Sequence, residues 1–516
     1  MRERIGHAWR PPAVWILVVG ADRDLPYRGD LDGSTVRADG RGPRLLLARE
    51  CAWYGNGSWS GAAASSVVAA SGLVVASSAV KLFGRRGCVF IRGRRGDVVR
   101  LLQRQADEAG GLVTTNRVAN LLRRRESPQR PTFLELFFDL VFVFALTRIV
   151  HELVLDYTRG HVAERLSTSL AENGETLLLF LAVWWIWTQT AWITSRFDPF
   201  QPPIQFVVLT TMYGSLFLAV AISGALAETG LLFASTYVAI QVGRTLFFVA
   251  IVRGHHLRRV NMLALIWFGA SAVPWLTGAF APEVTRNLLW TLALAIDYLG
   301  ARFGWPVPGL GRSRVSPWAV AGEHLAERYW QLVIVALGET ILTSGSSLLR
   351  GPIVAERTVA LTLSFLTTVL LWRIYFYRAG QILGEAVGAS ADPGRLGRSA
   401  EFSHLLMVAG ILATSAGSEL VLMDPFGDAK PAWVGAILGG PALYLAGRSV
   451  FEYVAFARVS RPRPIGFLVL AAMAPVLVGL PPLGVAAAAV AVLLGVAVSD
   501  TTRAHGRPLE EASPPR

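Results

Sequence analysis

The segment Phe133–Glu152 constrains this chain most, because FLELFFDLVFVFALTRIVHE is an apolar run of helical length that contains acids. Glu135 and Asp139 stand four residues apart near its start, so both carboxylates lie on one face of the predicted helix. A charge inside a membrane-spanning helix is costly and usually faces protein or a water-filled cavity. The segment therefore predicts a membrane helix whose acids have a structural or functional role.

The composition is that of an integral membrane protein. Hydrophobic residues make up 53% of the chain, charged residues 16%, and the mean hydropathy is +0.45. From residue 133 onward, apolar runs recur, each close to the roughly 20 residues that cross a bilayer. We predict an all-α integral membrane protein of about twelve transmembrane helices. Their predicted starts are near Phe133, Glu175, Ile204, Gly230, Met262, Val284, Trp330, Arg357, Phe402, Ala432, Ile465 and Gly484.

Three regions follow from the distribution of charge. Residues 1–130 hold 22 of the Arg and Lys residues against 11 Asp and Glu, which is most of the chain's net charge of +13. They lack helical or strand periodicity, so we predict a basic, disordered N-terminal extension, or a stretch upstream of a misplaced start codon. Residues 131–500 form the predicted polytopic membrane domain, and residues 501–516 a cytoplasmic tail. The arginines are dispersed without aromatic interleaving, so no nucleic-acid partner is predicted.

Basic residues mark alternate loops. The segment before the first predicted helix is basic, and so is every second loop after it, whereas the alternate loops are neutral or acidic. Only the loop with Arg350 and Arg357 weakens this pattern. The positive-inside rule therefore predicts that both termini are cytoplasmic, which an even number of spans allows. The basic residues include Arg123, Arg196, Arg253, Arg302, Arg395, Arg398 and Arg458.

Three short similarities indicate an internal duplication. Each pairs a segment of the first half with one of the second half, in the same order and at similar separations. The simplest account is a parallel six-plus-six repeat with halves of about 131–320 and 321–500, an architecture found in transporters. The pairs are Glu135–Val141 with Glu327–Val333, Trp184–Trp187 with Trp372–Tyr375, and Gly243–Phe247 with Gly447–Phe451.

The charged residues within predicted spans are the candidate site residues. Acids and bases at similar depth can pair, and the repeat predicts Asp139 with Arg244, and Glu339 with Arg448. Such pairs could instead only lock helices together, and this alternative stays open. The candidates for a substrate or ion pathway are Asp139, Arg244, Asp297, Glu339, Arg373, Glu419 and Arg448.

Glu339 and Asp139 are the leading candidates for an ion or proton site. Glu339 lies near the middle of its predicted span, in the segment ALGETILTSG, whose small side chains allow close approach or a hydrated cavity. Glu135 stands at a helix N-terminus, where capping of free backbone N–H groups is the favoured interpretation.

Other polar and aromatic groups favour structural interpretations. His324 and Glu327 have a metal-ligand spacing, yet two residues do not make a zinc site, and an interfacial turn is favoured. The tryptophans at 184, 185, 187 and 192 could stack against a ligand, but interface anchors are more usual. We therefore predict no metal site, no cofactor and no enzymatic activity, because no nucleophile–base constellation is present.

Several segments of the chain together resemble the bacterial low temperature requirement protein A family. The resemblance covers roughly residues 120 to 500 and implies a multi-pass bacterial membrane protein that supports growth in the cold. Two positions depart from it: Arg148 stands where the family often has Gln, and Tyr377 where it often has Asp. The role of that Asp is therefore not carried over. The matching segments are LELFFDLVFVFALT at 134–147, HLAERYWQLVIVALGETI at 324–341, LLWRIYFYRA at 370–379, SHLLMVAGILATSAGSE at 403–419 and GGPALYLAGRSVF at 439–451.

Transport or permeation of a small solute or ion is the function that these features favour. The alternative is a non-transport membrane factor, linked to lipids or acting as a scaffold, that supports growth in the cold. The expected partners are the lipid bilayer and a small solute or ion, and the expected location is the bacterial cytoplasmic membrane.

Overall fold

The computed structural model describes ten segments of the chain: 44–48, 73–76, 79–82, 88–92, 121–123, 130–159, 166–313, 318–377, 382–505 and 512–514. Contacts divide the chain into two units, Met1–Thr114 and Thr115–Arg516. The candidate site residues all belong to the second unit, so each unit is described by itself.

The N-terminal unit contains two short antiparallel strand pairs. Strand β1 (Arg44–Ala48) pairs with β4 (Cys88–Arg92), and β2 (Leu73–Ala76) pairs with β3 (Ala79–Leu82). Most of residues 1–130 lies outside the described residues, as does part of the tail 501–516, so the predictions made for these regions stay predictions.

The C-terminal unit is built from helices, and a helix covers each of the twelve predicted positions. A further short helix, α10 (Ile382–Ala389), lies between the eighth and ninth of them. The others are α2 (Phe133–Arg159), α3 (Leu166–Arg196), α4 (Pro202–Ile222), α5 (Gly230–Ile251), α6 (His256–Ala279), α7 (Glu283–Phe303), α8 (Trp318–Leu349), α9 (Ala355–Phe376), α11 (Pro393–Met423), α12 (Pro431–Phe456), α13 (Pro462–Met473) and α14 (Pro482–Ala504).

Nine of the described helices are long and apolar enough to cross a membrane: α3, α4, α5, α6, α8, α9, α11, α12 and α14. Of the other three at predicted positions, α13 has only 12 residues. Both α2 and α7 contain three charged residues within their first eighteen positions. Length and composition thus support a multi-pass membrane protein.

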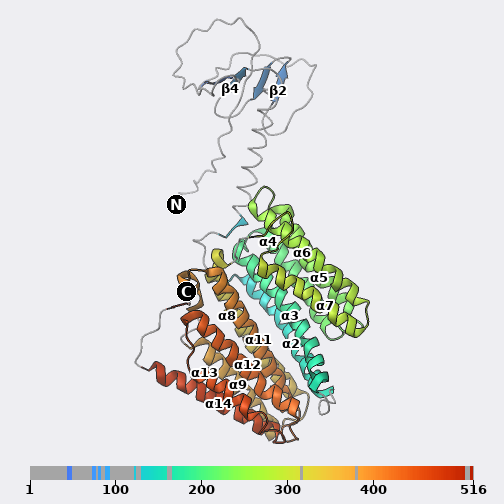
Figure 1. Ribbon diagram of the computed structural model, residues 1–516, viewed down its shortest axis with the longest axis vertical. Coiled ribbons are helices and arrows are strands. Elements are labelled where there is room, and N and C mark those ends of the chain that lie inside the picture. The colour runs from blue at the N-terminus through green and yellow to red at the C-terminus, as the bar shows by residue number, and fades with distance from the viewer. Residues whose placement is uncertain are drawn as a thin grey trace, which may run out of the picture. The chain divides into compact units, whose positions relative to one another are not determined.

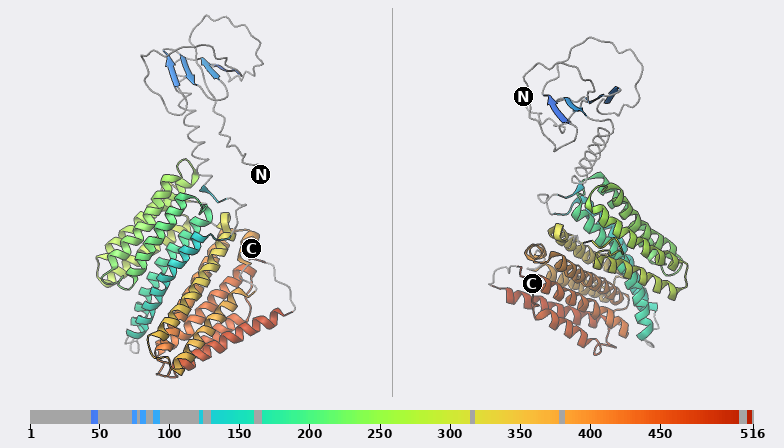
Figure 2. Two further views of the ribbon diagram at one scale, coloured as in Figure 1. Left: turned by 180° about the vertical axis from the view of Figure 1, so that it is seen from behind. Right: turned by 45° about the horizontal axis from the view of Figure 1, so that its top comes forward.

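The helices are arranged in two groups around a shared middle. In Figure 1, and from behind in Figure 2, α4 to α7 lie on one side and α12 to α14 on the other, with α2, α3 and α8 between them. Helix α8 contacts both α2 and α3, and α11 packs on α2 as well as on α12. The two groups are therefore held together through α2, α3, α8 and α11.

An exposed apolar stripe on α4 indicates where lipid contacts the protein. Phe206, Leu209, Tyr213, Leu216 and Val220 are exposed and recur every three or four residues, so they share one helical face. A continuous apolar face of this kind would be unfavourable in water and favourable against acyl chains.

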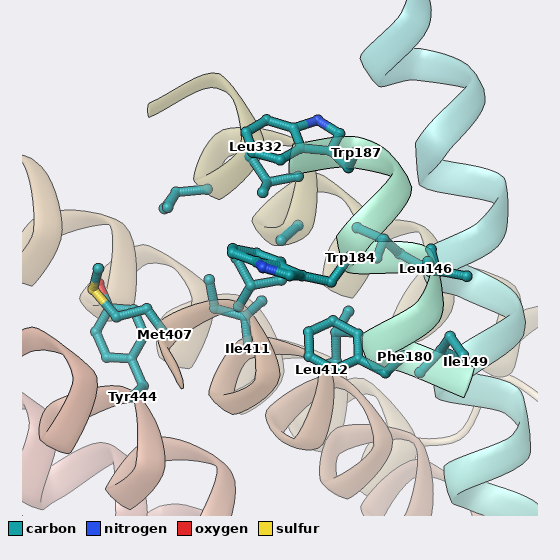
Figure 3. Close-up of a cluster of buried hydrophobic side chains, with 14 of the residues drawn as sticks. Leu146, Ile149, Phe180, Trp184, Trp187, Leu332, Met407, Ile411, Leu412 and Tyr444 are labelled. Carbon is teal, nitrogen blue, oxygen red and sulfur yellow. The ribbon is translucent and has the colours of Figure 1, made fainter. Parts of the chain in front are cut away.

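In contrast to the exposed stripe of α4, several aromatic side chains of α3 lie in the protein core. Trp184, Trp185 and Trp187 are at most 1% exposed. Figure 3 shows Trp184 between Leu146 of α2 and Ile411 of α11, and Trp187 beside Leu332 of α8. The interface-anchor interpretation is therefore wrong for these three: they are packing residues at the junction of several helices.

Glycine allows α11 and α12 to approach closely. A Cβ added to Gly410 of α11 would lie 2.5 Å from the backbone nitrogen of Tyr444, and one added to Gly440 of α12 would lie 2.4 Å from that of Thr414. Close contact between small residues is a main source of helix association in membranes. The glycines thus let the backbones of α11 and α12 pack directly against each other.

Candidate functional site

Four charged or ionisable side chains meet where α2 packs on α8. Arg328 donates from Nη2 to Asp139 Oδ1 at 2.7 Å and from Nη1 to Oδ2 at 2.8 Å. His324 Nε2 lies 3.4 Å from Glu135 Oε1, and Arg328 Nε lies 4.0 Å from that oxygen. All four residues are at most 1% exposed. We call Glu135, Asp139, His324 and Arg328 the α2–α8 charge cluster.

Sequence spacing explains why this cluster assembles. Glu135 and Asp139 are four apart on α2, and His324 and Arg328 are four apart on α8, so each pair lies on one helical face. Facing helices with the same spacing bring each acid opposite a base. The Asp139 carboxylate accepts three hydrogen bonds. Two come from the bidentate guanidinium of Arg328, and the third comes from Trp187 Nε1–H, which donates to Oδ1 at 2.9 Å.

The predicted pairing of Asp139 with Arg244 is wrong. Arg244 of α5 donates from Nη1 to Thr190 Oγ1 at 3.1 Å and from Nη2 to Gln241 Oε1, while the oxygens of Asp139 are bound by Arg328 and Trp187. Arg328 was missed because the predicted helix began only at Trp330. The matched spacing of the two pairs was the signal that could have found it.

Two further expectations concern the first turns of these helices. Thr132 N–H and Oγ1–H both donate to Glu135 Oε2, at 2.8 and 2.9 Å, so the capping role of Glu135 is confirmed. His324 is fully buried and its Nδ1 lies 2.8 Å from Ser195 Oγ, so the interfacial interpretation of this histidine is wrong. Within the described residues, no group of three or more His, Cys, Asp or Glu could hold a metal ion.

Glu339 of α8 is buried and forms no ion pair with any residue that the structure describes. Its carboxyl group is 0% exposed and lies in the apolar segment Gly322–Leu349. Thr343, one turn further along, donates its hydroxyl to Oε1, whereas Oε2 has no hydrogen-bond partner in the described part of the chain. Two acids of α2 and α8 thus differ sharply: Asp139 is neutralised by an arginine and Glu339 is not.

A polar cavity of about 340 Å³ reaches Thr343. It lies among the C-terminal halves of α2, α8 and α11, and we call it the Thr343 cavity. One of its walls is the ion pair of Glu419 with Arg350, so Glu419 has a cation partner that the sequence did not identify. Its lining residues are Thr147, Arg148, His151, Thr343, Ser346, Arg350 and Glu419.

The predicted pairing of Glu339 with Arg448 is also wrong. Arg448 of α12 is 0% exposed; its Nε donates to the backbone oxygen of Ile374 at 3.2 Å, and its Cζ lies 5.1 Å from the Phe451 ring centre. Neither terminal nitrogen of Arg448 has a hydrogen-bond partner among the described residues. The repeat aligned these residues in sequence, but α12 directs its arginine toward the backbone of α9.

The remaining candidates lie apart from one another. Asp297 of α7 accepts a hydrogen bond from Tyr237 OH at 2.9 Å. Arg373 of α9 donates to Thr501 Oγ1 at 3.2 Å and lies over the ring of Tyr377, with Cζ 3.4 Å from its centre. The seven candidates therefore do not form one site.

A second cavity, of about 360 Å³, lies at the opposite ends of the helices from the Thr343 cavity. Residues from α3, α5, α6 and α7 line most of it, and its charged lining residues are all arginines: Arg196, Arg244, Arg302, Arg312 and Arg398. We call it the arginine cavity. Of the predicted site residues it contains only Arg244.

Comparison with known proteins places residues 130–498 in one family model, whose description is bacterial low temperature requirement A protein (LtrA). The uncharacterized protein RA0937 of Rhizobium meliloti (strain 1021) is 34% identical over 340 residues, which are 65% of this chain and 80% of that protein. No solved structure gives a significant match. The matched region contains the α2–α8 charge cluster and both cavities.

Proposed function

The chain belongs to the bacterial low temperature requirement A protein family, and from this premise we propose that it transports or conducts a small solute or ion across a membrane. The observation that carries the proposal is Glu339, a fully buried acid that has no cationic partner in the described segments and whose neighbour Thr343 lines a polar cavity. The proposal assigns the chain no enzymatic activity.

The physical argument rests on the cost of a buried charge. An acid inside a membrane helix is expensive and usually lies on a substrate, ion or proton pathway, or pairs with a base. Asp139 pairs with a base, because it forms an ion pair with Arg328. Among the described residues, the hydroxyl of Thr343 donates to Glu339 Oε1 and Oε2 has no hydrogen-bond partner, so Glu339 can exchange a proton or bind a small cation. The Thr343 cavity supplies the route by which either would arrive.

We further propose twelve spans arranged as two similar halves. The two halves share their pattern of helix contacts, which supports a parallel repeat. Helix α2 contacts α3 and α4 as α8 contacts α9 and α11, and α5–α6–α7 are in serial contact as α12–α13–α14 are. An early duplication of six helices would produce this correspondence.

The proposed orientation in the bacterial cytoplasmic membrane places both termini in the cytoplasm. Arg196, Arg302 and Arg395 lie in the terminal turns of α3, α7 and α11, and Arg253 follows α5, as the positive-inside rule requires near cytoplasmic loops. In this orientation the arginine cavity opens toward the cytoplasm and the Thr343 cavity toward the opposite side.

The proposal is tested by ion flux. The full-length protein is reconstituted into liposomes under an imposed proton or cation gradient, and uptake is compared between wild type and Glu339→Gln. We expect uptake in the wild type and at least tenfold slower uptake in the variant. Glu356→Gln serves as the matched control, because Glu356 is exposed in the first turn of α9 and should leave the rate unchanged.

The absence of flux in the wild type, across several ions and both gradient directions, would contradict the transport proposal. The alternative, a scaffold or lipid-linked factor for growth in the cold, would then be favoured. One observation already fits that alternative: the α2–α8 charge cluster is closed to solvent, so its four side chains hold helices together and contact no solute.

A further inference from the structure

The arginine cavity has an unusual electrostatic character for a hollow among membrane helices. Five arginines line it, and no Asp or Glu is among its lining residues. The helix ends do not offset this charge. The C-terminal ends of α3, α5 and α7 contribute about −0.5 of a charge each, and the first turns of α6 about +0.5, so their sum is small beside five guanidinium groups.

Three hydrogen-bond donors in this cavity lack acceptors. Gln189 Nε2, Trp192 Nε1 and Arg196 Nη2 are buried, and none has a hydrogen-bond partner among the residues that the structure describes. They follow one another at spacings of three and four along α3, so they share a helical face, and all three residues line the cavity. Buried polar groups are nearly always satisfied, so three orphan donors at one place point to an absent acceptor.

Arg244 supplies the deepest positive charge. It is 7% exposed, and its guanidinium donates to Thr190 Oγ1 and Gln241 Oε1, which are both neutral. No acid lies within ion-pair distance of it in the described segments. A desolvated guanidinium without a counter-charge is costly, and a bound anion would remove that cost.

We propose that the arginine cavity binds a small oxyanion, a carboxylate or phosphate group, held by Arg244 and Arg196 together with the free N–H groups of Gln189 and Trp192. Guanidinium groups bind such anions in a bidentate manner. A volume of about 360 Å³ admits an ion with a small organic body, and Phe248, Phe268 and Trp305 provide apolar walls for it. The site goes beyond the proposed function, because none of its residues lines the Thr343 cavity.

Binding is tested with the full chain in nanodiscs of phosphatidylcholine, a lipid without net charge. Sodium phosphate and sodium succinate are titrated separately, and binding is followed by isothermal calorimetry and by tryptophan fluorescence, since Trp192 and Trp305 line the cavity. We expect saturable binding of at least one anion. Arg244→Gln and Gln189→Leu should weaken it at least tenfold.

Two kinds of variant keep the test sharp. Arg302→Gln and Arg312→Gln alter exposed cavity residues and should fold normally, so their expected loss of affinity cannot be ascribed to unfolding. Arg253→Gln is the matched control, because Arg253 is an exposed arginine near the same helix ends but outside the cavity lining. It should bind like the wild type.

The source of the oxyanion is distinguished by a second arm with phosphatidylglycerol nanodiscs. A rise in melting temperature that phosphatidylglycerol produces in wild type but not in Arg302→Gln, without binding of either soluble anion, would identify a lipid headgroup as the ligand. If neither soluble anion binds and phosphatidylglycerol has no such effect, or if Arg253→Gln weakens binding as much as the cavity variants, the proposal is overturned. Flux through Glu339 is measured separately, so the two proposals can fail independently.

Discussion

The first and second halves of α8 differ in how their buried charged side chains are paired. Near its start, Arg328 forms two hydrogen bonds with Asp139 of α2, and His324 lies beside Glu135. Eleven residues further on, Glu339 is equally buried, accepts a hydrogen bond from the hydroxyl of Thr343 in its own helix, and forms no ion pair within the described segments. The first end is a closed contact between helices, whereas the second adjoins a cavity.

This difference shows that burial alone does not identify a functional charge. A buried pair can be a purely structural device, and removing one partner exposes the full cost of the other charge. An unpaired acid contributes nothing of this kind to helix association, so its presence in an apolar helix requires another explanation. Four single variants and one double variant test the contrast, and the single variants are given from the largest expected effect on stability to the smallest.

Arg328→Met should have the largest effect, because it leaves Asp139 buried without its cation. We expect a loss of about 3–5 kcal/mol in the free energy of unfolding, measured by reversible denaturation in detergent micelles. Arg258→Met is the matched control: Arg258 is an exposed arginine of α6, so a loss below about 1 kcal/mol is expected.

The double variant Asp139→Leu with Arg328→Met sharpens this prediction. Since the buried carboxylate of Asp139 is then removed together with its cation, it should be more stable than Arg328→Met alone. If Arg328→Met unfolds like the wild type yet abolishes flux, the comparison is wrong, because Asp139 and Arg328 would then belong to the transport pathway.

Trp187→Phe should have the next largest effect. It removes one of the three donors to the Asp139 carboxylate while keeping an aromatic ring in the core. A hydrogen bond to a charged group is worth about 1.5–3 kcal/mol, and the loss should appear as a lower melting temperature. Trp372→Phe on the exposed face of α9 controls for the change of residue type and should be nearly silent.

Thr343→Val tests the other end of α8 and should cost about 1 kcal/mol, the worth of an ordinary hydrogen bond. Because Thr343 joins Glu339 to the cavity, ion flux should also fall. Both quantities are measured on the same preparation, with Thr362→Val, an exposed threonine of α9, as control. An unchanged flux rate would separate the cavity from Glu339.

Glu339→Gln should change stability least, by less than about 1 kcal/mol, because no cation loses its partner and the amide oxygen can still accept from Thr343. The change in stability is measured by thermal unfolding of Glu339→Gln and of the wild type, both in detergent and after reconstitution into liposomes. A loss as large as that of Arg328→Met would show that Glu339 is a structural acid and would remove the contrast between the two ends of α8.

Most of the membrane fold could be predicted because lipid imposes a simple rule on sequence. A span must be apolar over about 20 residues, so helices are visible as runs. The rule fails for α8, because the charged residues in its first turns resemble those of a loop. These turns pack on α2, where Glu135 and Asp139 pair with His324 and Arg328 and so lower the cost of burying them. It also misjudged the tryptophans of α3, since hydropathy does not reveal whether a residue faces lipid or protein.

The site was predictable only in part. Glu339 and Asp139 were found as buried acids, because an acid in an apolar run is a local signal. Their partners depend on how helices far apart in sequence rotate and pack, and the sequence pairing with Arg244 and Arg448 failed for this reason. The arginine cavity gave no local signal, since Arg196, Arg302 and Arg398 come from the ends of three helices that are separated in the chain.

The pairing of Asp139 with Arg328 has a consequence for biosynthesis. The two residues are 189 positions apart, so at roughly 5–20 residues per second the ribosome makes the acid about ten to forty seconds before its base. During that interval the two carboxylates of α2 lack the basic side chains that α8 supplies. Its nascent helix must therefore stay beside the insertion machinery, or at the bilayer surface, until α8 is delivered.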